Sequence, residues 1–267
     1  MQESTIWTVT ERTDQKIDSL REVIKKAHET RLTKEDEDYQ YAIHNFKEGT
    51  IKNTGYSYAQ LVKYKKEPSI ESFDLANDKI DTENTRNPPI VGYSNFVVFD
   101  KYLLIEQKGN TLGQRQVLNA ILDFYSETAP EIDLGFMLDT KILEDFIETQ
   151  EKITLIRFSN IILNPNNPDE NVQKFEDIIR DSNSKNTEFS NSAGDGINKN
   201  SKIMNGGFTL LKLNKLNVKI ESETEGSKQI FNSAKGRNKL KEKISYERGE
   251  RDTTVFHRFL EKIRELL

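Results

Sequence analysis

The chain has 267 residues, of which 39 are lysine or arginine and 44 are aspartate or glutamate, so its formal net charge is −5 at pH 7. The sequence contains no cysteine, which excludes disulfides, thiolate metal sites and a cysteine nucleophile, and its three histidines are too few for a histidine-rich metal site. It has neither a run of about 18 apolar residues nor a signal-peptide pattern, so we expect no membrane-spanning helix and a cytoplasmic location.

The charge is distributed unevenly along the chain. Residues 201–267 contain fifteen basic and nine acidic residues, a net charge of +6, whereas residues 1–200 contain 24 basic and 35 acidic residues, a net charge of −11. A basic segment of this kind is able to dock on phosphates while an acidic body repels them. A solvated helix face would have the same composition, so both interpretations stay open.

The first part of the chain predicts one helix followed by strands. Apolar residues recur at helical spacing in residues 14–29, and we interpret residues 1–49 as an N-terminal helical segment. Residues 56–64 alternate weakly between apolar and polar side chains, which indicates a strand, whereas the polar, proline-containing stretch 66–89 indicates a loop or a weakly ordered crossing. Two continuous apolar runs within residues 96–105, separated by Asp-Lys, predict a buried hairpin.

Helices and strands alternate in the middle of the chain. Thr111 and Gln114 have the spacing of a capping box, which predicts that a helix begins there. The elements predicted next are a strand at 134–138, a helix at 140–149, a strand at 152–163 and a helix at 168–180. The sequence therefore predicts an α+β fold, in which a mixed β-sheet built from hairpins is packed with helices and residues 50–183 form the central domain.

The last third of the chain begins with a polar tract. Thirteen of the twenty residues 181–200 are Ser, Asn, Gly or Asp, so we interpret residues 184–200 as a polar loop or linker. Beyond it, residues 201–267 predict a basic C-terminal module, with one or two strands at 208–221 and a helix at 254–267. This helix has a dense apolar face, which either folds back on the body or contacts another chain. The candidate oligomer or partner interface consists of Phe256, Phe259, Leu260, Ile263 and Leu267.

The same module contains candidate phosphate contacts. Every second residue from 235 to 243 is basic, so an extended segment would point all five side chains to one face, whereas a helix would spread them around its cylinder. Further lysines are interleaved with apolar residues in the stretch 208–221. The predicted nucleic-acid-binding residues are Lys212, Lys215, Lys219, Lys235, Arg237, Lys239, Lys241 and Lys243.

Patterns that carry chemistry are sparse. Asp100, Glu106 and Lys108 have the residue types of a magnesium-dependent nuclease, a weak third hypothesis. In a two-residue hairpin, however, Asp100 and Glu106 lie on the order of 17–20 Å apart, which is too far for one ion. The sequence contains no Gly-x-Ser-x-Gly, no phosphate loop and no Gly-x-Gly-x-x-Gly. We therefore expect no enzyme activity, no cofactor and no metal site.

The segment PPIVGYSNFVVFDKYLLIEQKGNTLGQRQVLNAIL (88–122) joins a Gly-aromatic-Ser-x-Phe start to an apolar hairpin, a Gly-x-Thr loop and a helix. This order resembles the RexA-type phage-exclusion proteins, the DNA-binding partner in a two-gene system that aborts phage infection. The likeness extends more loosely over about residues 50–230, including a polar strand with a Glu-Gly turn at 218–226. The resemblance implies a cytoplasmic homodimer that binds double-stranded DNA without sequence preference and works with a membrane effector encoded nearby.

One part of the chain departs from the family's pattern. Family members carry basic residues on the strand that ends in the Asp/Glu-Gly turn, whereas here only Lys219 is basic and Glu221, Glu223 and Glu225 follow it. DNA binding would then depend on Lys212, Lys215 and the 235–243 run. The leading hypothesis is an anti-phage defence protein that binds DNA non-specifically and signals to a partner effector. The alternative is a protein–protein adaptor or regulatory subunit of a defence complex without DNA binding.

Overall fold

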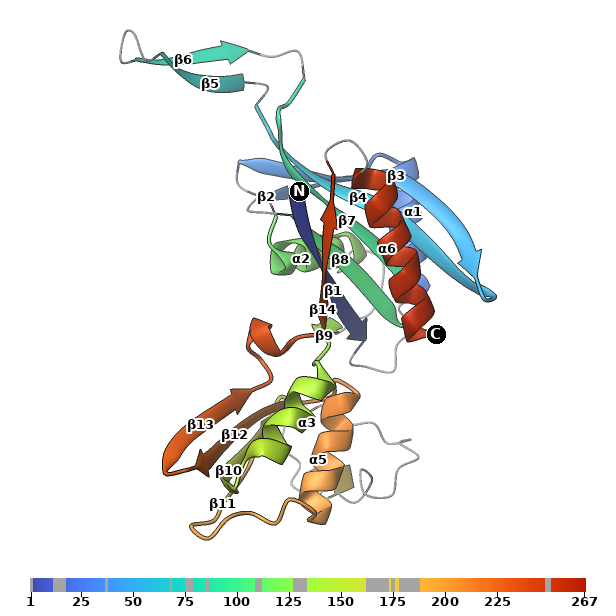
Figure 1. Cartoon of the computed structure of the whole chain (residues 1–267). Coiled ribbons are helices and arrows are strands. Elements are labelled where there is room, and N and C mark those ends of the chain that lie inside the picture. Colours follow the sequence, from blue (N-terminus) through green and yellow to red (C-terminus); the bar gives the residue numbers. More distant parts are fainter. Residues whose placement is uncertain are drawn as a thin grey trace. The chain divides into compact units, whose positions relative to one another are not determined.

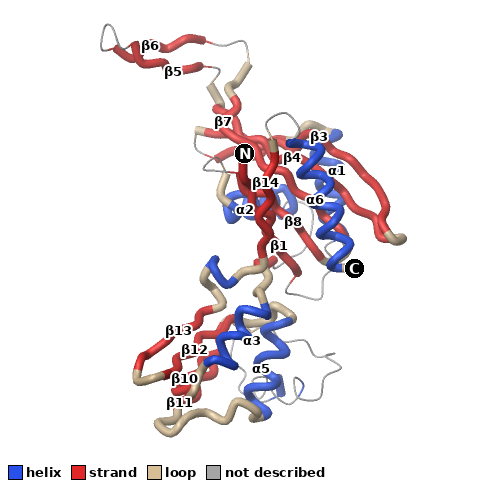
Figure 2. Tube along the Cα trace, viewed as in Figure 1, coloured by secondary structure: helices blue, strands red, loops and turns tan. Residues whose placement is uncertain are grey.

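The computed structural model describes most of the chain, namely residues 2–11, 18–36, 38–67, 69–74, 79–84, 87–108, 112–126, 134–161, 173, 176–177, 188–247 and 251–267. These residues form helices and sheets whose recorded strand pairs are antiparallel (Figures 1 and 2). The predicted α+β class is therefore confirmed. Within these ranges no helix has the length and apolar character needed to cross a bilayer.

The chain forms two compact units, and each unit draws on separate stretches of the sequence. Unit 1 consists of Met1–Trp7, Lys16–Glu131 and Glu242–Leu267, and unit 2 consists of Thr8–Gln15 and Ile132–Lys241. The predicted boundaries do not coincide with this division. In particular, the predicted basic module at 201–267 is not one body, because its first part belongs to unit 2 and its last part to unit 1. The boundaries were predicted from changes in amino-acid composition. The units instead depend on strand pairing, because β14 near the C-terminus pairs with β1 at the N-terminus.

The strands of unit 1 follow the order β14-β1-β8-β7-β4-β3-β2. The elements of unit 1 are β1 (Gln2–Glu11, which continues into unit 2), α1 (Asp18–Glu29), β2 (Thr33–Asp36), β3 (Tyr39–Ile51), β4 (Thr54–Lys65), β5 (Ser69–Asp74), β6 (Lys79–Asn84), β7 (Ile90–Phe99), β8 (Tyr102–Lys108), α2 (Gln114–Ser126), β14 (Lys241–Tyr246, which begins in unit 2) and α6 (Arg251–Leu266).

Two predictions for unit 1 are wrong. Residues 1–49 are not a helical segment, because β1, β2 and β3 accompany α1. Residues 5–10 of β1 are Thr, Ile, Trp, Thr, Val and Thr, a β-branched and aromatic run that favours a strand. The predicted loop at 66–89 contains the antiparallel strands β5 and β6, since backbone pairing does not require an apolar sequence.

Other predictions for unit 1 are confirmed. The strand at 56–64 is the centre of β4, and the two apolar runs form the β7–β8 hairpin, in which Phe99 pairs with Tyr102. Asp100 makes the turn with a φ of +44°, a conformation that aspartate tolerates better than most residues. The helix α2 begins at Gln114, while its predicted cap, Thr111, lies outside the described residues.

Helices cover both faces of the unit 1 sheet. Arg21 of α1 donates a hydrogen bond to Ser57 of β4, whereas the ring of the next residue, Tyr58, meets Phe256 and Phe259 of α6 edge-on. Successive side chains of a strand point to opposite faces, so α1 and α6 lie on opposite sides of β4. The apolar face of α6 therefore folds back on its own chain, which is one of the two outcomes that the sequence left open.

Unit 2 contains a four-stranded antiparallel sheet in the order β11-β10-β12-β13, with α3 and α5 packed on one face (Figure 1). Its core joins Leu143 of α3 and Met204 of α5 to Phe158, Ile220 and Phe231 of the sheet. The elements of unit 2 are β9 (Leu134–Phe136), α3 (Thr140–Thr149), β10 (Lys152–Ser159), β11 (Phe189–Ser192), α5 (Lys202–Lys212), β12 (Asn217–Thr224), β13 (Ser227–Asn232) and a 3₁₀ turn (Gly236–Asn238).

The helix α3 agrees with its predicted range, and its two ends explain why. The Asp139 carboxylate accepts hydrogen bonds from the backbone N–H groups of Lys141 and Ile142, which caps the N-terminus. At the other end, Lys199 Nζ donates to the carbonyl oxygens of Ile147 and Gln150, at 2.9 and 2.7 Å. A cation at this position compensates the carbonyls that the helix leaves without partners. The loop after β11 is thereby attached to α3.

The predicted strands at 208–221 are partly wrong, because the helix α5 occupies the first residues of this stretch. Ser201 caps the helix by accepting a hydrogen bond from the Met204 N–H. At the other end, Asn214 has a φ of +59° and donates to the Leu211 carbonyl, while the Lys215 N–H bonds the Leu210 carbonyl. These two bonds form a Schellman motif, which ends α5 before β12 begins.

Two further strands predicted for unit 2 are confirmed, and the other predicted elements lie partly outside the described residues. The strand at 134–138 is confirmed as β9, and the strand at 152–163 is confirmed as β10 as far as Ser159. Most of the predicted helix at 168–180 lies outside the described residues, as do residues 184–187 of the predicted linker. The described remainder of that linker contains the short strand β11.

The contact between α5 and β10 gives a test of the fold. A Cβ atom at Gly207 would overlap the ring of Phe158, so Gly207→Ala forces the helix away from the sheet. We expect a loss of about 1–3 kcal/mol in the free energy of unfolding, although alanine favours a helix over glycine by about 1 kcal/mol. Urea unfolding measures this loss. Gly194→Ala is the matched control, because a Cβ there meets open space; an equal effect of both substitutions contradicts the packing.

Candidate nucleic-acid interface

The face of the unit 2 sheet opposite α3 and α5 carries charged side chains. Along β12, Val218, Ile220 and Ser222 are buried, while the alternate residues Lys219 and Glu221 are partly exposed. This period of two is the reason why a short strand contributes both to the core and to a charged surface. We call the exposed side the open face of unit 2.

Two cations lie opposite each other on the open face. Arg157 of β10 pairs in register with Lys219 of β12, and both side chains are well exposed. Like charges in direct cross-strand positions destabilise a sheet, so neighbouring carboxylates have to compensate this pair. Arg157 Nε lies 3.0 Å from a Glu188 carboxylate oxygen, and Lys219 Nζ lies 2.8 Å from Glu221 Oε1.

A third cation binds the Glu221 carboxylate from the neighbouring strand. Lys228 Nζ of β13 lies 2.6 Å from Glu221 Oε2, so each oxygen of Glu221 is bound to a different lysine. The Glu221 side chain is only 16% exposed, whereas those of Lys219 and Lys228 are 38% and 63% exposed. We call these three residues the Glu221 clamp. With one carboxylate and two ammonium groups, the clamp has a net charge of +1.

The two lysines determine the protonation of Glu221. The hydrogen bond from Lys219, followed by that from Lys228, lowers the pKa of Glu221 from 4.5 to about 2, and partial burial opposes this shift. The carboxylate therefore stays ionised well below pH 4.5, and both lysine contacts are charge-assisted hydrogen bonds.

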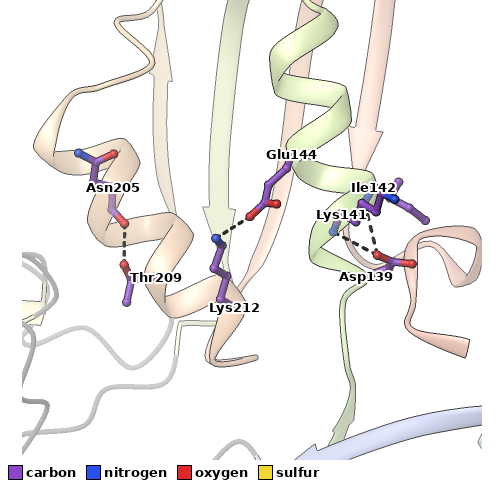
Figure 3. A network of polar contacts seen from close by, with 7 residues as sticks. All are labelled: Asp139, Lys141, Ile142, Glu144, Asn205, Thr209 and Lys212. Atoms are coloured by element: carbon purple, nitrogen blue, oxygen red, sulfur yellow. Dashed lines mark hydrogen bonds and ion pairs between the residues drawn. The ribbon is translucent and has the colours of Figure 1, made fainter. Parts of the chain in front are cut away.

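The other predicted basic residues of α5 and the following turn do not join the open face. Lys212 lies on α5, on the opposite side of the sheet, where its Nζ is 2.7 Å from the Glu144 carboxylate (Figure 3). Lys215 is buried, with 8% of its surface exposed. The structure therefore separates Lys212, Lys215 and Lys219, which the sequence placed together.

The Lys212–Glu144 pair bridges a groove between α5 and α3 (Figure 3). The groove has a volume of about 440 Å³, and the side chains of Leu143, Ile147 and Phe208 supply its apolar lining. The ion pair of Lys212 thus connects two helices of the same unit, α5 and α3.

The basic run from 235 to 243 is neither one strand nor one helix. A 3₁₀ turn covers Gly236–Asn238, and β14 begins only at Lys241, so the five basic residues do not form one row. Lys239 donates to the Phe136 carbonyl at 3.0 Å, which ties it to β9. The exposed residues of the run are Lys235, Lys241 and Lys243, and the side chain of Arg237 lies outside the described part.

The predicted partner interface is largely a packing surface of unit 1. Phe259 and Ile263 are 0% and 1% exposed, and Phe256 packs on Tyr56 and Tyr58 of β4. Leu260 is partly buried, and Leu267 remains exposed. The dense apolar face that suggested a partner is thus covered mainly by the chain's own sheet.

One of the two acidic residues of the nuclease hypothesis, Glu106, is inaccessible. Glu106 is completely buried, and its carboxylate accepts hydrogen bonds from Ser4 Oγ and Asn95 Nδ2, both at 2.6 Å. Tyr58 and Gln60 in turn donate to Asn95, so the network ties β1, β8, β7 and β4 together. A carboxylate in this position holds strands together and cannot reach a substrate. No group of three or more metal-ligating side chains occurs among the residues that are described.

A comparison with models of known protein families finds no match, and comparisons with curated proteins and with solved structures find none either.

The sequence prediction named Lys219 of the open face but not Arg157 or Lys228. Arg157 stands in the apolar run of β10 between Ile156 and Phe158, which are both buried. A basic residue between two buried neighbours on a strand points to the other face, so this alternation was a usable signal. Lys228 had no such signal, because its place beside Glu221 depends on the register between β12 and β13.

The low pKa of Glu221 makes the stability of unit 2 pH-dependent. A carboxyl whose pKa falls from 4.5 to about 2 on folding stabilises the fold above pH 4.5, and this contribution is lost as the pH falls through about 2. Urea unfolding at about pH 6 and about pH 3 should therefore give a stability difference between the native chain and Glu221→Gln that is larger at pH 6. A difference of the same size at both pH values contradicts the ion pairs.

Proposed function

We propose that the chain is a non-enzymatic anti-phage defence protein that binds double-stranded DNA without sequence preference through the open face of unit 2. One observation carries the proposal: Arg157 and Lys219 face each other across β10 and β12 on an exposed surface, with Lys228 nearby on β13. Each of these two cations is paired with a carboxylate, Arg157 with Glu188 and Lys219 with Glu221, and a polyanion that lies across them would compensate the like charges further.

The contacts available to this surface determine what it can recognise. Lysine and arginine side chains on a flat sheet reach phosphate oxygens, which carry no sequence information. Binding is then driven by the counterions that DNA releases, and its strength depends on salt. Three cations per chain are few, so a homodimer that presents two such faces to one duplex is part of the proposal.

The defence role rests on the resemblance of residues 88–122 to the RexA-type proteins. In this proposal the dimer is cytoplasmic and signals DNA occupancy to a membrane effector encoded nearby. The open face is consistent with that likeness, because it includes the strand that ends in the Glu-Gly turn, where Glu225 and Gly226 both have positive φ. The same strand bears the basic residues in the family.

The salt dependence of DNA binding tests the proposal. For three phosphate contacts, the plot of log K against log salt should have a slope of about −2.7, or about −5.4 if both faces of a dimer bind one duplex. Arg157→Gln with Lys219→Gln should reduce the slope by about 2 per chain and weaken binding to two unrelated duplexes equally. Fluorescence anisotropy with labelled 20-bp duplexes, a length of about two helical turns, provides the measurement.

Lys212→Gln is the matched control, since it removes one positive charge from the other side of the unit 2 sheet. It should leave the slope unchanged. No binding of any duplex at low salt, or a loss in the control as large as in the double variant, would remove this function.

A second candidate is a protein–protein adaptor or regulatory subunit of a defence complex without DNA binding. The observation that favours it is the pairing of cations with carboxylates: Lys212 binds Glu144, and Lys219 binds Glu221. Surfaces of mixed charge are typical of the polar rim of a protein interface. Removal of residues 254–267 from the chain would not separate the two functions, because α6 is part of the unit 1 core. The low-salt binding experiment separates them.

A further inference from the structure

We infer that Glu221 is an internal competitor for phosphate, so that the open face accepts only a polyanion able to replace the Glu221 carboxylate on Lys219 and Lys228 together. This inference rests on the proposed function and concerns its regulation. It assigns a role to the acidic residue that interrupts the basic surface.

The geometry of the clamp matches that of a bound phosphate group. The two oxygens of Glu221 accept separately from Lys219 Nζ and Lys228 Nζ, at 2.8 and 2.6 Å. Two oxygens of a phosphate group are acceptors of the same kind, since ammonium groups form charge-assisted hydrogen bonds with either oxyanion. While Glu221 holds both donors, a phosphate on this face finds only the N–H groups of Arg157 other than the Nε bound to Glu188, and the remaining N–H groups of the lysines.

Glu221 has an advantage over a free anion because it is attached to the same sheet. It lies two residues from Lys219 on β12, and Lys228 is on the adjacent strand. A tethered ligand competes at an effective concentration of the order of millimolar or higher. A single phosphate ion has to exceed that concentration, whereas DNA that also contacts Arg157 gains from several linked contacts. The class of ligand that opens the clamp is therefore a polymer with adjacent phosphates.

The surroundings of Glu221 make its release costly. Its cross-strand neighbours are Leu155 of β10 and Ile230 of β13, and both are apolar. A carboxylate that loses both lysines gives up two charge-assisted hydrogen bonds, so its release costs free energy. This cost is subtracted from the free energy of DNA binding, and any change that removes or shortens the carboxylate should strengthen binding.

Two substitutions test the inference. Glu221→Gln removes the charge at constant size, and Glu221→Asp keeps the charge but shortens the side chain by one methylene, so that it cannot bridge both lysines. Glu223→Gln and Glu223→Asp are the matched controls, because Glu223 is exposed, occupies the next outward position of the same strand and lies opposite Lys228 in register, so they change a carboxylate equally near the clamp. We expect Glu221→Gln to tighten the Kd for a 20-bp duplex about tenfold, as expected for two freed charge-assisted donors.

The control Glu223→Gln should change the Kd by about twofold, the effect of one exposed charge on a nearby polyanion. Glu221→Asp should bind more tightly than the native chain, although the net charge is the same. Inorganic phosphate at about 10 mM, matched for ionic strength, should compete with DNA better in Glu221→Gln than in the native chain. Circular dichroism melting confirms that each variant is folded.

The outcomes separate this inference from the function on which it rests. Native chain that binds DNA, with Glu221 variants that bind no better than the Glu223 controls, overturns the clamp and leaves DNA binding in place. Native chain that binds DNA about tenfold more weakly than Glu221→Gln, with a change of only about twofold for Glu223→Gln, supports the clamp. Native chain that binds no duplex at low salt removes the proposed function, even where Glu221→Gln binds. Failure of the native chain and of both Glu221 variants overturns the inference and the proposed function together.

Discussion

The alternation of side chains along β12 is the constraint on which unit 2 depends. Val218, Ile220 and Ser222 point toward α3 and α5, and this burial fixes the register of β12 between β10 and β13, because a slip by one residue would expose them. The same register fixes the neighbours of Lys219 and Glu221 on the other face. Packing of the core therefore positions the charged cluster, and no residue of that cluster has to contribute to the core to be held in place.

Charge compensation is local on the open face. Arg157 and Lys219 are opposite each other, and each has a carboxylate within 3.0 Å. A pairing of this kind explains why the fold tolerates like charges in register. Some N–H donors of the open face are therefore already bound to carboxylates, and the others are accessible to a ligand. Which of these a ligand can use depends on the hydrogen bonds of each lysine more than on the net charge of −5 of the whole chain.

The sequence predicted elements well where local signals and burial agree. The helix α3 has a side-chain cap at Asp139, and the β7–β8 hairpin has two continuous apolar runs around a two-residue turn. The helix α5 was missed because its cap, Ser201, follows a polar tract and because Gly206 and Gly207 disfavour a helix locally. The contact of Gly207 with Phe158 explains that glycine, and this contact is tertiary. The site followed the same rule: alternation could have indicated Arg157, whereas the pairing of Lys228 with Glu221 requires the register of β13.

The acidic residues of β12 and of the turn after it have different surroundings in the structure. Counted along the chain, Glu221, Glu223 and Glu225 cancel the positive charge of this strand and argue against DNA binding. In the structure they are not equivalent, since Glu221 is largely covered and bound to two lysines, while Glu223 and Glu225 are exposed. An exposed carboxylate acts on a ligand through a potential that salt screens over about 10 Å. Glu221 instead occupies the donors that a phosphate would use, and it does so from a position between two apolar neighbours. The sum of the charges on this strand does not distinguish a DNA-binding surface from a surface of mixed charge that suits a protein partner. The distinction depends on whether the N–H donors of Lys219 and Lys228 are bound to Glu221 or to a ligand.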